Sequence, residues 1–269
     1  MQILVSTGAL IGRPNGRNIR LLEEYLPKLN YDGIEFMFYS DWYDSFEEIT
    51  GFLRSLEVPI PVVHCQKTIG ELVTSGQTKE ALSKFEINVK VASSLGASKI
   101  VMHLWNGSIS DSNFELTLET YPKLRKISER YGVDLLVENV LCNVSTPFTR
   151  WLEIHHEYPD AHFIFDTKMA QFHDEYKKLF EPSCEWLFRE NLIKHYHVND
   201  YGGGYMTWDQ LKVLPVGKGN IDFEPFFEKI AEIGYDDTMT VEATAFGADG
   251  RIDFDMLNKC YSDIRRMLR

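Results

Sequence analysis

The sequence predicts an α/β protein with a single (β/α)8 TIM barrel domain over residues 1–269. Apolar segments of strand length alternate with helical segments along the whole chain, and this unit occurs eight times without a linker or low-complexity tract. Nearly continuous apolar strands are typical of a parallel sheet that is buried on both faces. A doubly wound open sheet is the alternative, but the STGALIG segment after the first strand lacks the G-x-G-x-x-G pattern common in such sheets.

Each expected strand is a short apolar run that ends in polar or turn residues. The eight strands are expected at residues 2–6, 32–37, 59–64, 98–103, 133–138, 162–166, 192–197 and 238–242.

Several helices between these strands carry boundary signals. Ser112 and Glu115 have the spacing of a capping box, and Thr146 followed by Pro147 predicts a cap and a first-turn proline. The last two helices are expected to lie between Asp222 and Gly234 and to run from Asp253 to Met267.

Composition and charge restrict the class of protein. The net charge is −12, from 28 Lys and Arg against 40 Asp and Glu, which disfavours a nucleic acid as the main partner. No apolar run has the length of a membrane span, so no membrane association is expected. The four cysteines are widely spaced without a Cys-x-x-Cys pair, and the first residues do not resemble a signal peptide. We therefore expect a cytoplasmic protein with reduced thiols.

Acidic or imidazole side chains close four of the expected strands. In order, these residues are Glu138, Asp166, His197 and Glu242. A charge at the last position of a buried apolar run is hard to explain by packing. The carboxyl ends of barrel strands meet at one rim, so the four side chains could share a divalent cation. Three carboxylates and one imidazole suit manganese, magnesium, cobalt or zinc.

Each of these residues also has an ordinary structural interpretation. Asp166 before Thr167 is typical of a helix cap. Glu138 or Glu242 could pair with a lysine of the barrel, and His197 could be a hydrogen-bonded core histidine. The occurrence of all four in strand order favours metal binding.

The motifs around these residues resemble the xylose isomerase-like TIM barrel superfamily, which includes ketose 3-epimerases, hydroxypyruvate isomerases, inosose dehydratases and endonuclease IV. The matching segments are DGIEF (32–36), LLVENV (135–140), IFDT (164–167), HVND (197–200), PVGKGNIDF (215–223) and TVEA (240–243). The resemblance implies one divalent metal ion, with Glu138 and Glu242 as the catalytic base and acid. It also implies that Asp166 and His197 chiefly hold the metal.

His64 and His103 end the third and fourth expected strands. In endonuclease IV, histidines on these strands help to hold a second zinc together with the glutamate of the fifth strand. The resemblance therefore leaves three interpretations: a second metal shared with Glu138, hydrogen bonds to substrate hydroxyls, or packing at the rim. Substrate contact is the favoured one.

Three further residues are candidates for substrate binding. Trp105 belongs to a set of aromatic residues in the expected rim loops, where rings stack well on the C–H faces of a sugar or cyclitol. Glu35, on the second strand, could contact substrate or make a structural hydrogen bond. Lys168 could supply a hydrogen-bond donor or lie on a solvated helix face.

Two departures from the family pattern bear on function. The sixth-strand Asp-x-x-His of the family is here Asp166-Thr167-Lys168-Met169, so Met169 replaces the histidine. The loop at 201–212 lacks both the arginine of ketose 3-epimerases and the Asp-x-His that completes the three-zinc site of endonuclease IV. Both losses disfavour a three-metal nuclease.

The resemblance implies a metal-dependent sugar isomerase or epimerase that removes a proton next to a ketose carbonyl to give an enediolate. The alternatives are a lyase of the inosose dehydratase kind, an endonuclease IV-like phosphodiesterase, and a barrel that binds a sugar without turnover. The expected partner is a small sugar or cyclitol. Relatives are often dimers or tetramers, so a homo-oligomer is a further expectation.

Overall fold

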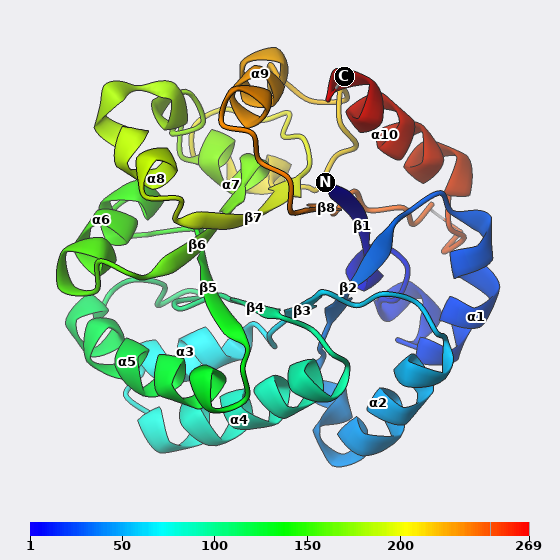
Figure 1. Cartoon of the computed structure of the whole chain (residues 1–269), viewed down its shortest axis with the longest axis horizontal. Helices are drawn as coiled ribbons and strands as arrows, with labels where there is room; N and C mark the ends of the chain where they lie inside the picture. Colours follow the sequence, from blue (N-terminus) through cyan, green and yellow to red (C-terminus); the bar gives the residue numbers. More distant parts are fainter. Residues whose placement is uncertain (248, 269) are drawn as a thin grey trace. The chain divides into compact units, whose positions relative to one another are not determined.

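The computed structural model describes residues 1–247 and 249–268, and their strands form a closed barrel in the order β1 to β8 (Figure 1). The strands are β1 (Gln2–Ser6), β2 (Gly33–Met37), β3 (Val62–His64), β4 (Lys99–Met102), β5 (Asp134–Glu138), β6 (His162–Asp166), β7 (Ile193–Val198) and β8 (Thr238–Val241). The registered pairs are all parallel. The predicted (β/α)8 barrel is therefore confirmed.

Helices follow the strands along the chain. They are α1 (Leu22–Tyr25), α2 (Phe46–Ser55), α3 (Thr68–Thr74), α4 (Thr78–Ser94), α5 (Phe114–Arg130), α6 (Pro147–Glu157), α7 (Thr167–Phe172), α8 (Glu185–Arg189), α9 (Glu224–Glu232) and α10 (Phe254–Met267). Short 3-10 turns precede or follow several of them. Within the described residues, no helix combines the length and the apolar character that crossing a bilayer requires.

Contacts divide the chain into two compact units. One holds residues 35–165 and 192–194, and the other holds residues 1–34, 166–191 and 195 onwards. In the first unit, β2 to β6 pair in sequence, and α3, α4 and α5 pack on one another. In the second unit, β8 pairs with both β1 and β7. The prediction of one domain over residues 1–269 stays a prediction.

Local boundaries agree with most of the sequence signals. Thr146 Oγ1 accepts a hydrogen bond from Thr149 N at the start of α6, and Asp253 Oδ1 accepts one from Met256 N at the start of α10. Gly234, with a φ of 62°, follows the end of α9 as expected.

Most strand ends lie within one residue of the prediction, but two sequence signals fail. β3 begins at Val62 rather than at residue 59, because Pro59 and Pro61 have no backbone N–H to donate to a sheet. The capping box at Ser112 is wrong. The Ser112 N–H donates to the Ile109 carbonyl in a turn, and α5 begins at Phe114 without a side-chain cap.

Candidate metal and substrate site

His64, His103 and Glu138 come together at the carboxyl ends of three neighbouring strands. His64 is the last residue of β3, His103 directly follows β4, and Glu138 is the last residue of β5. All three side chains are almost fully buried. Glu138 Oε2 lies 2.9 Å from His103 Nε2 and 3.3 Å from His64 Nε2. One carboxylate oxygen therefore faces two imidazole rings.

The Nδ1 atoms of His64 and His103, which are the ring nitrogens not facing Glu138, each lie within hydrogen-bond distance of an oxygen acceptor. His64 Nδ1 lies 2.8 Å from the carbonyl oxygen of Cys65, which can only accept a hydrogen bond. His103 Nδ1 lies 3.1 Å from Asn106 Oδ1. The Asn106 amide is itself oriented, because its Nδ2 donates to Glu71 Oε1 at 2.8 Å. Both rings thus carry their proton on Nδ1, and in the neutral form each Nε2 presents a lone pair.

Burial lowers the pKa of His103 to about 4, although the Glu138 carboxylate draws it the other way. The ring is therefore neutral at neutral pH, and its Nε2 lone pair faces a carboxylate oxygen. Two such nitrogens and a carboxylate form the ligand set that zinc and other divalent metals take. The donor chemistry at His64, His103 and Glu138 accordingly fits a divalent cation.

A second cluster lies in the other unit, where Asp166 ends β6, His197 is near the end of β7 and Glu242 directly follows β8. His197 Nδ1 lies 3.6 Å from Glu242 Oε2 and 3.8 Å from Asp166 Oδ2. Asp166 has two roles here. Its Oδ1 accepts a hydrogen bond from Met169 N and caps α7, while Oδ2 faces the histidine. The helix cap and the predicted metal ligand are thus compatible in one side chain.

Sequence reasoning assigned no role to Asn199 and Asp200, which complete the HVND motif at residues 197–200. Asn199 Nδ2 donates to Asp166 Oδ2 at 3.1 Å, and Glu242 Oε2 lies at 3.5 Å. Asp200 is fully buried and accepts four backbone hydrogen bonds from residues 201, 217, 219 and 221. The signal that could have found both residues is the HVND motif itself, which resembles the seventh-strand pattern of the family.

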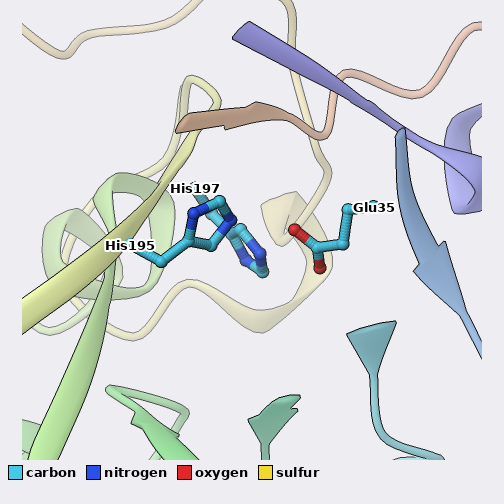
Figure 2. A group of neighbouring side chains, drawn as sticks. All are labelled: Glu35, His195 and His197. Atoms are coloured by element: carbon cyan, nitrogen blue, oxygen red, sulfur yellow. The ribbon is translucent and has the colours of Figure 1, made fainter. Parts of the chain in front are cut away.

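Figure 2 shows Glu35 on β2, and His195 and His197 on β7. Glu35 is fully buried in the middle of its strand. Both ring nitrogens of His195 are engaged with β8: Nδ1 lies 2.7 Å from Thr238 Oγ1, and Nε2 lies 3.0 Å from Thr240 Oγ1. His195 therefore links β7 to β8, whereas His197, two residues further on, faces the carboxylates.

The remaining predicted substrate residues are buried. The Trp105 indole is fully enclosed, its Nε1 donates to the Leu141 carbonyl, and its ring packs edge-on to Phe114. Its contacts are thus those of a packing residue. Lys168 is only 5% exposed in the first turn of α7, so it does not lie on a solvated helix face. Contact of either residue with substrate stays a prediction.

Comparison with known proteins places this barrel in a family. The model of the xylose isomerase-like TIM barrel family matches residues 24–260, and the chain belongs to that family. A search of curated proteins gave no match.

Several solved structures share the fold. A D-tagatose 3-epimerase-like protein is 20% identical with a TM-score of 0.70, covering 100% of this chain and 97% of that one. The 3-keto-D-glucoside 4-epimerase from E. coli is 15% identical with a TM-score of 0.71, covering 99% of each chain. A D-psicose 3-epimerase from Clostridium cellulolyticum H10, solved with D-tagatose, is 16% identical with a TM-score of 0.72, covering 100% of both chains. At these identities the likeness establishes the fold.

Proposed function

We propose that this protein is a divalent-metal-dependent sugar isomerase or epimerase that acts on a ketose or a related polyol. The observation that carries the proposal is the cluster at the ends of β6, β7 and β8, where oxygens of Asp166 and Glu242 lie within 4 Å of His197 Nδ1. Carboxylates and an imidazole at strand ends are the ligands expected for manganese, cobalt, magnesium or zinc. Family membership and the sugar epimerases among proteins of the same fold support a carbohydrate substrate.

In the proposed reaction, Glu138 acts as the base and Glu242 as the acid. A divalent metal, when bound, supplies Lewis-acid polarisation of the ketose carbonyl and the adjacent hydroxyl. Glu138 removes the proton from the carbon next to the carbonyl, which gives an enediolate, and Glu242 returns a proton. Asp166 and His197 hold the metal, and capping of α7 by Asp166 Oδ1 fixes the direction of its other oxygen. Return of the proton to the opposite face gives the epimer.

A second candidate function rests on His64 and His103. Their Nε2 atoms converge on one oxygen of Glu138, which is the arrangement expected for a second metal ion. With two metals the barrel would suit hydrolysis of a phosphodiester. Proton transfer at a ketose remains the first proposal, because the chain is acidic and the 201–212 loop lacks the Asp-x-His that completes the three-zinc site of endonuclease IV.

The test is solvent deuterium exchange. Purified protein loaded with Mn²⁺ is incubated in deuterated water with a panel of ketohexoses that includes D-tagatose, and deuterium on carbon is followed by NMR. We expect incorporation next to the carbonyl, and its loss in Glu242→Gln. Glu228→Gln, a change on α9, provides the control for loss of a negative charge.

The outcomes separate the candidates. Loss of water from an inosose without exchange into ketoses would replace the isomerase by a lyase. Hydrolysis of a bis-phosphodiester model substrate, together with two bound zinc ions per chain, would move the second candidate to the front. No exchange into any ketose by metal-loaded protein would contradict the proposal.

A further inference from the structure

Asn199 directly follows β7 and is fully buried, and its backbone is fixed independently of its side chain. Its N–H donates to Thr167 Oγ1 at 3.1 Å, and its carbonyl lies 2.6 Å from the same hydroxyl. Thr167 in turn directly follows Asp166 in the chain. The path of the backbone at residue 199 therefore does not depend on what the carboxamide contacts.

The carboxamide bridges two predicted metal ligands. Asn199 Nδ2 lies 3.1 Å from Asp166 Oδ2 and 3.5 Å from Glu242 Oε2. These are the same two oxygens that face His197 Nδ1 at 3.8 and 3.6 Å. The amide nitrogen thus contacts the carboxylate oxygens that the proposed function assigns to the metal.

The other atom of the amide shows which way the side chain must point. Asn199 Oδ1 is buried and accepts no hydrogen bond from the described residues. A buried carbonyl oxygen without a hydrogen-bond partner destabilises a fold. Any stabilising contribution of the Asn199 side chain therefore comes from the hydrogen bonds that its Nδ2 donates. The reversed amide would place Oδ1 against two carboxylate oxygens, which repel it. The orientation with Nδ2 toward Asp166 and Glu242 is therefore the only favourable one.

We propose that Asn199 is a positioning residue for a divalent metal held by Asp166, His197 and Glu242; the metal itself rests on the proposed function. The carboxylates of Asp166, which is buried, and Glu242, which is partly exposed, repel each other, and the amide N–H groups offset this repulsion before an ion binds. Hydrogen bonds to ligating carboxylates also fix which lone pairs remain for the metal.

The neutrality of the amide is part of this role. A lysine at position 199 would compete with the metal for the carboxylates, and an aspartate would add a third negative charge to the metal-free cluster. An amide donates hydrogen bonds to both carboxylate oxygens without neutralising them, so their negative charge remains available to a cation.

The experiment measures Mn²⁺ binding rather than catalysis. Chelator-treated wild type, Asn199→Leu and Asn199→Asp are titrated with Mn²⁺ by calorimetry, and each is melted with and without the metal. We expect Asn199→Leu to bind Mn²⁺ about 10- to 100-fold more weakly, the usual effect of losing such a supporting hydrogen bond. We expect Asn199→Asp to melt lower without metal and to show a larger rise in melting temperature when Mn²⁺ is added.

Asn88→Leu is the matched control. Asn88 is also a fully buried asparagine, but its amide bonds Gln66 N, Lys84 O and the Tyr43 hydroxyl. The control is expected to melt lower than wild type while keeping the wild-type affinity for Mn²⁺.

The results distinguish this inference from the proposed function. Wild-type affinity in a folded Asn199→Leu protein would overturn the positioning role while leaving the proposed metal intact. Should Asn199→Leu not fold, Asn199→Asp decides, and an unchanged rise in its melting temperature on adding Mn²⁺ overturns the role. Failure of the wild type to bind Mn²⁺ would defeat the proposed function and this inference together.

Discussion

Nε2 of His103 lies 2.9 Å from Oε2 of Glu138, and both atoms are buried at the ends of neighbouring parallel strands. The Nδ1 of the same ring is held by Asn106, so the neutral ring directs a lone pair at the carboxylate. Electrostatic repulsion between a lone pair and a carboxylate oxygen is relieved by a cation. The proposed function accordingly gives Glu138 both a metal-binding and a proton-transfer role.

We expect Glu138→Gln to lower the rate of deuterium exchange into a ketose by a factor of roughly 10²–10⁴, because it removes the proposed general base. The same change removes a proposed metal ligand, so the metal content per chain should also fall. Exchange is followed by NMR, and metal by elemental analysis of the purified variant. Glu47→Gln, at an exposed position on α2, is the control and should retain both properties. Wild-type exchange in Glu138→Gln would remove Glu138 from the mechanism.

Most of the fold could be predicted from the sequence. Apolar runs such as residues 2–6, 133–138 and 162–166 are strong signals, because strands buried on both faces tolerate few polar residues. The boundaries that failed depend on competition between hydrogen bonds. Ser112 resembles a helix cap locally, but the neighbouring Asp111 is drawn to the backbone of residues 143–145, which the sequence pattern cannot show.

The candidate site was only partly predictable. Strand-end positions make Glu138, Asp166, His197 and Glu242 candidates without any knowledge of contacts. For His64 and His103 the sequence favours substrate contact over a second metal, and that choice stays a prediction; the anchoring of their Nδ1 atoms by Cys65 and Asn106 could not be read from the sequence. The enclosure of Trp105 and the contacts of Asn199 also depend on packing between segments far apart in the chain.

The link from Glu71 through Asn106 to His103 predicts a tautomer effect. We expect Asn106→Leu to release Nδ1 of His103 and to allow the proton to move to Nε2, which would then donate to Glu138. The tautomer is read from nitrogen chemical shifts of ¹⁵N-labelled histidine in metal-free protein. Asn143→Leu, which removes a hydrogen bond to the Ser108 carbonyl, is the matched control and should leave the His103 tautomer unchanged. A His103 ring that keeps its proton on Nδ1 in Asn106→Leu would contradict this assignment.

Gly219 is required by a close approach of its backbone to Asp200 and Tyr201. A Cβ at this position would meet Asp200 Oδ1 and the carbonyl of Tyr201 at distances no folded protein tolerates. We expect Gly219→Ala to cost about 1–3 kcal/mol in the free energy of unfolding, the usual penalty for overpacking. Amides at 217, 219 and 221, which donate to Asp200, should exchange faster in hydrogen-exchange mass spectrometry. Gly51→Ala, where nothing lies within 4 Å of the added Cβ, is the control, and an equal effect of the two changes would contradict the prediction.

We expect the hydrogen bonds of Asp111 to make the unit that contains Glu138 less stable at acid pH. Its carboxylate is buried and accepts hydrogen bonds from the backbone of residues 143, 144 and 145, and from Arg150 Nε at 2.8 Å. Burial alone would raise the pKa of Asp111, but the hydrogen bonds from Val144, Arg150 and Asn143 hold it below its ordinary value of 3.8. These hydrogen bonds hold the backbone of residues 143–145, a few residues after Glu138, in place.

Because the folded-state pKa of Asp111 is depressed, its contribution to stability is fully present above the ordinary value and is lost as the pH falls through the folded-state pKa. We expect Asp111→Asn to lower the free energy of unfolding by about 3–5 kcal/mol at pH 7, since it leaves Arg150 without its buried partner. The difference between wild type and variant should shrink below about pH 4, as linkage requires. Urea unfolding from pH 7 to pH 3 measures it, and Asp44→Asn at an exposed position is the control. A difference that stays constant down to pH 3 would mean that the neutral acid serves this contact as well as the carboxylate does.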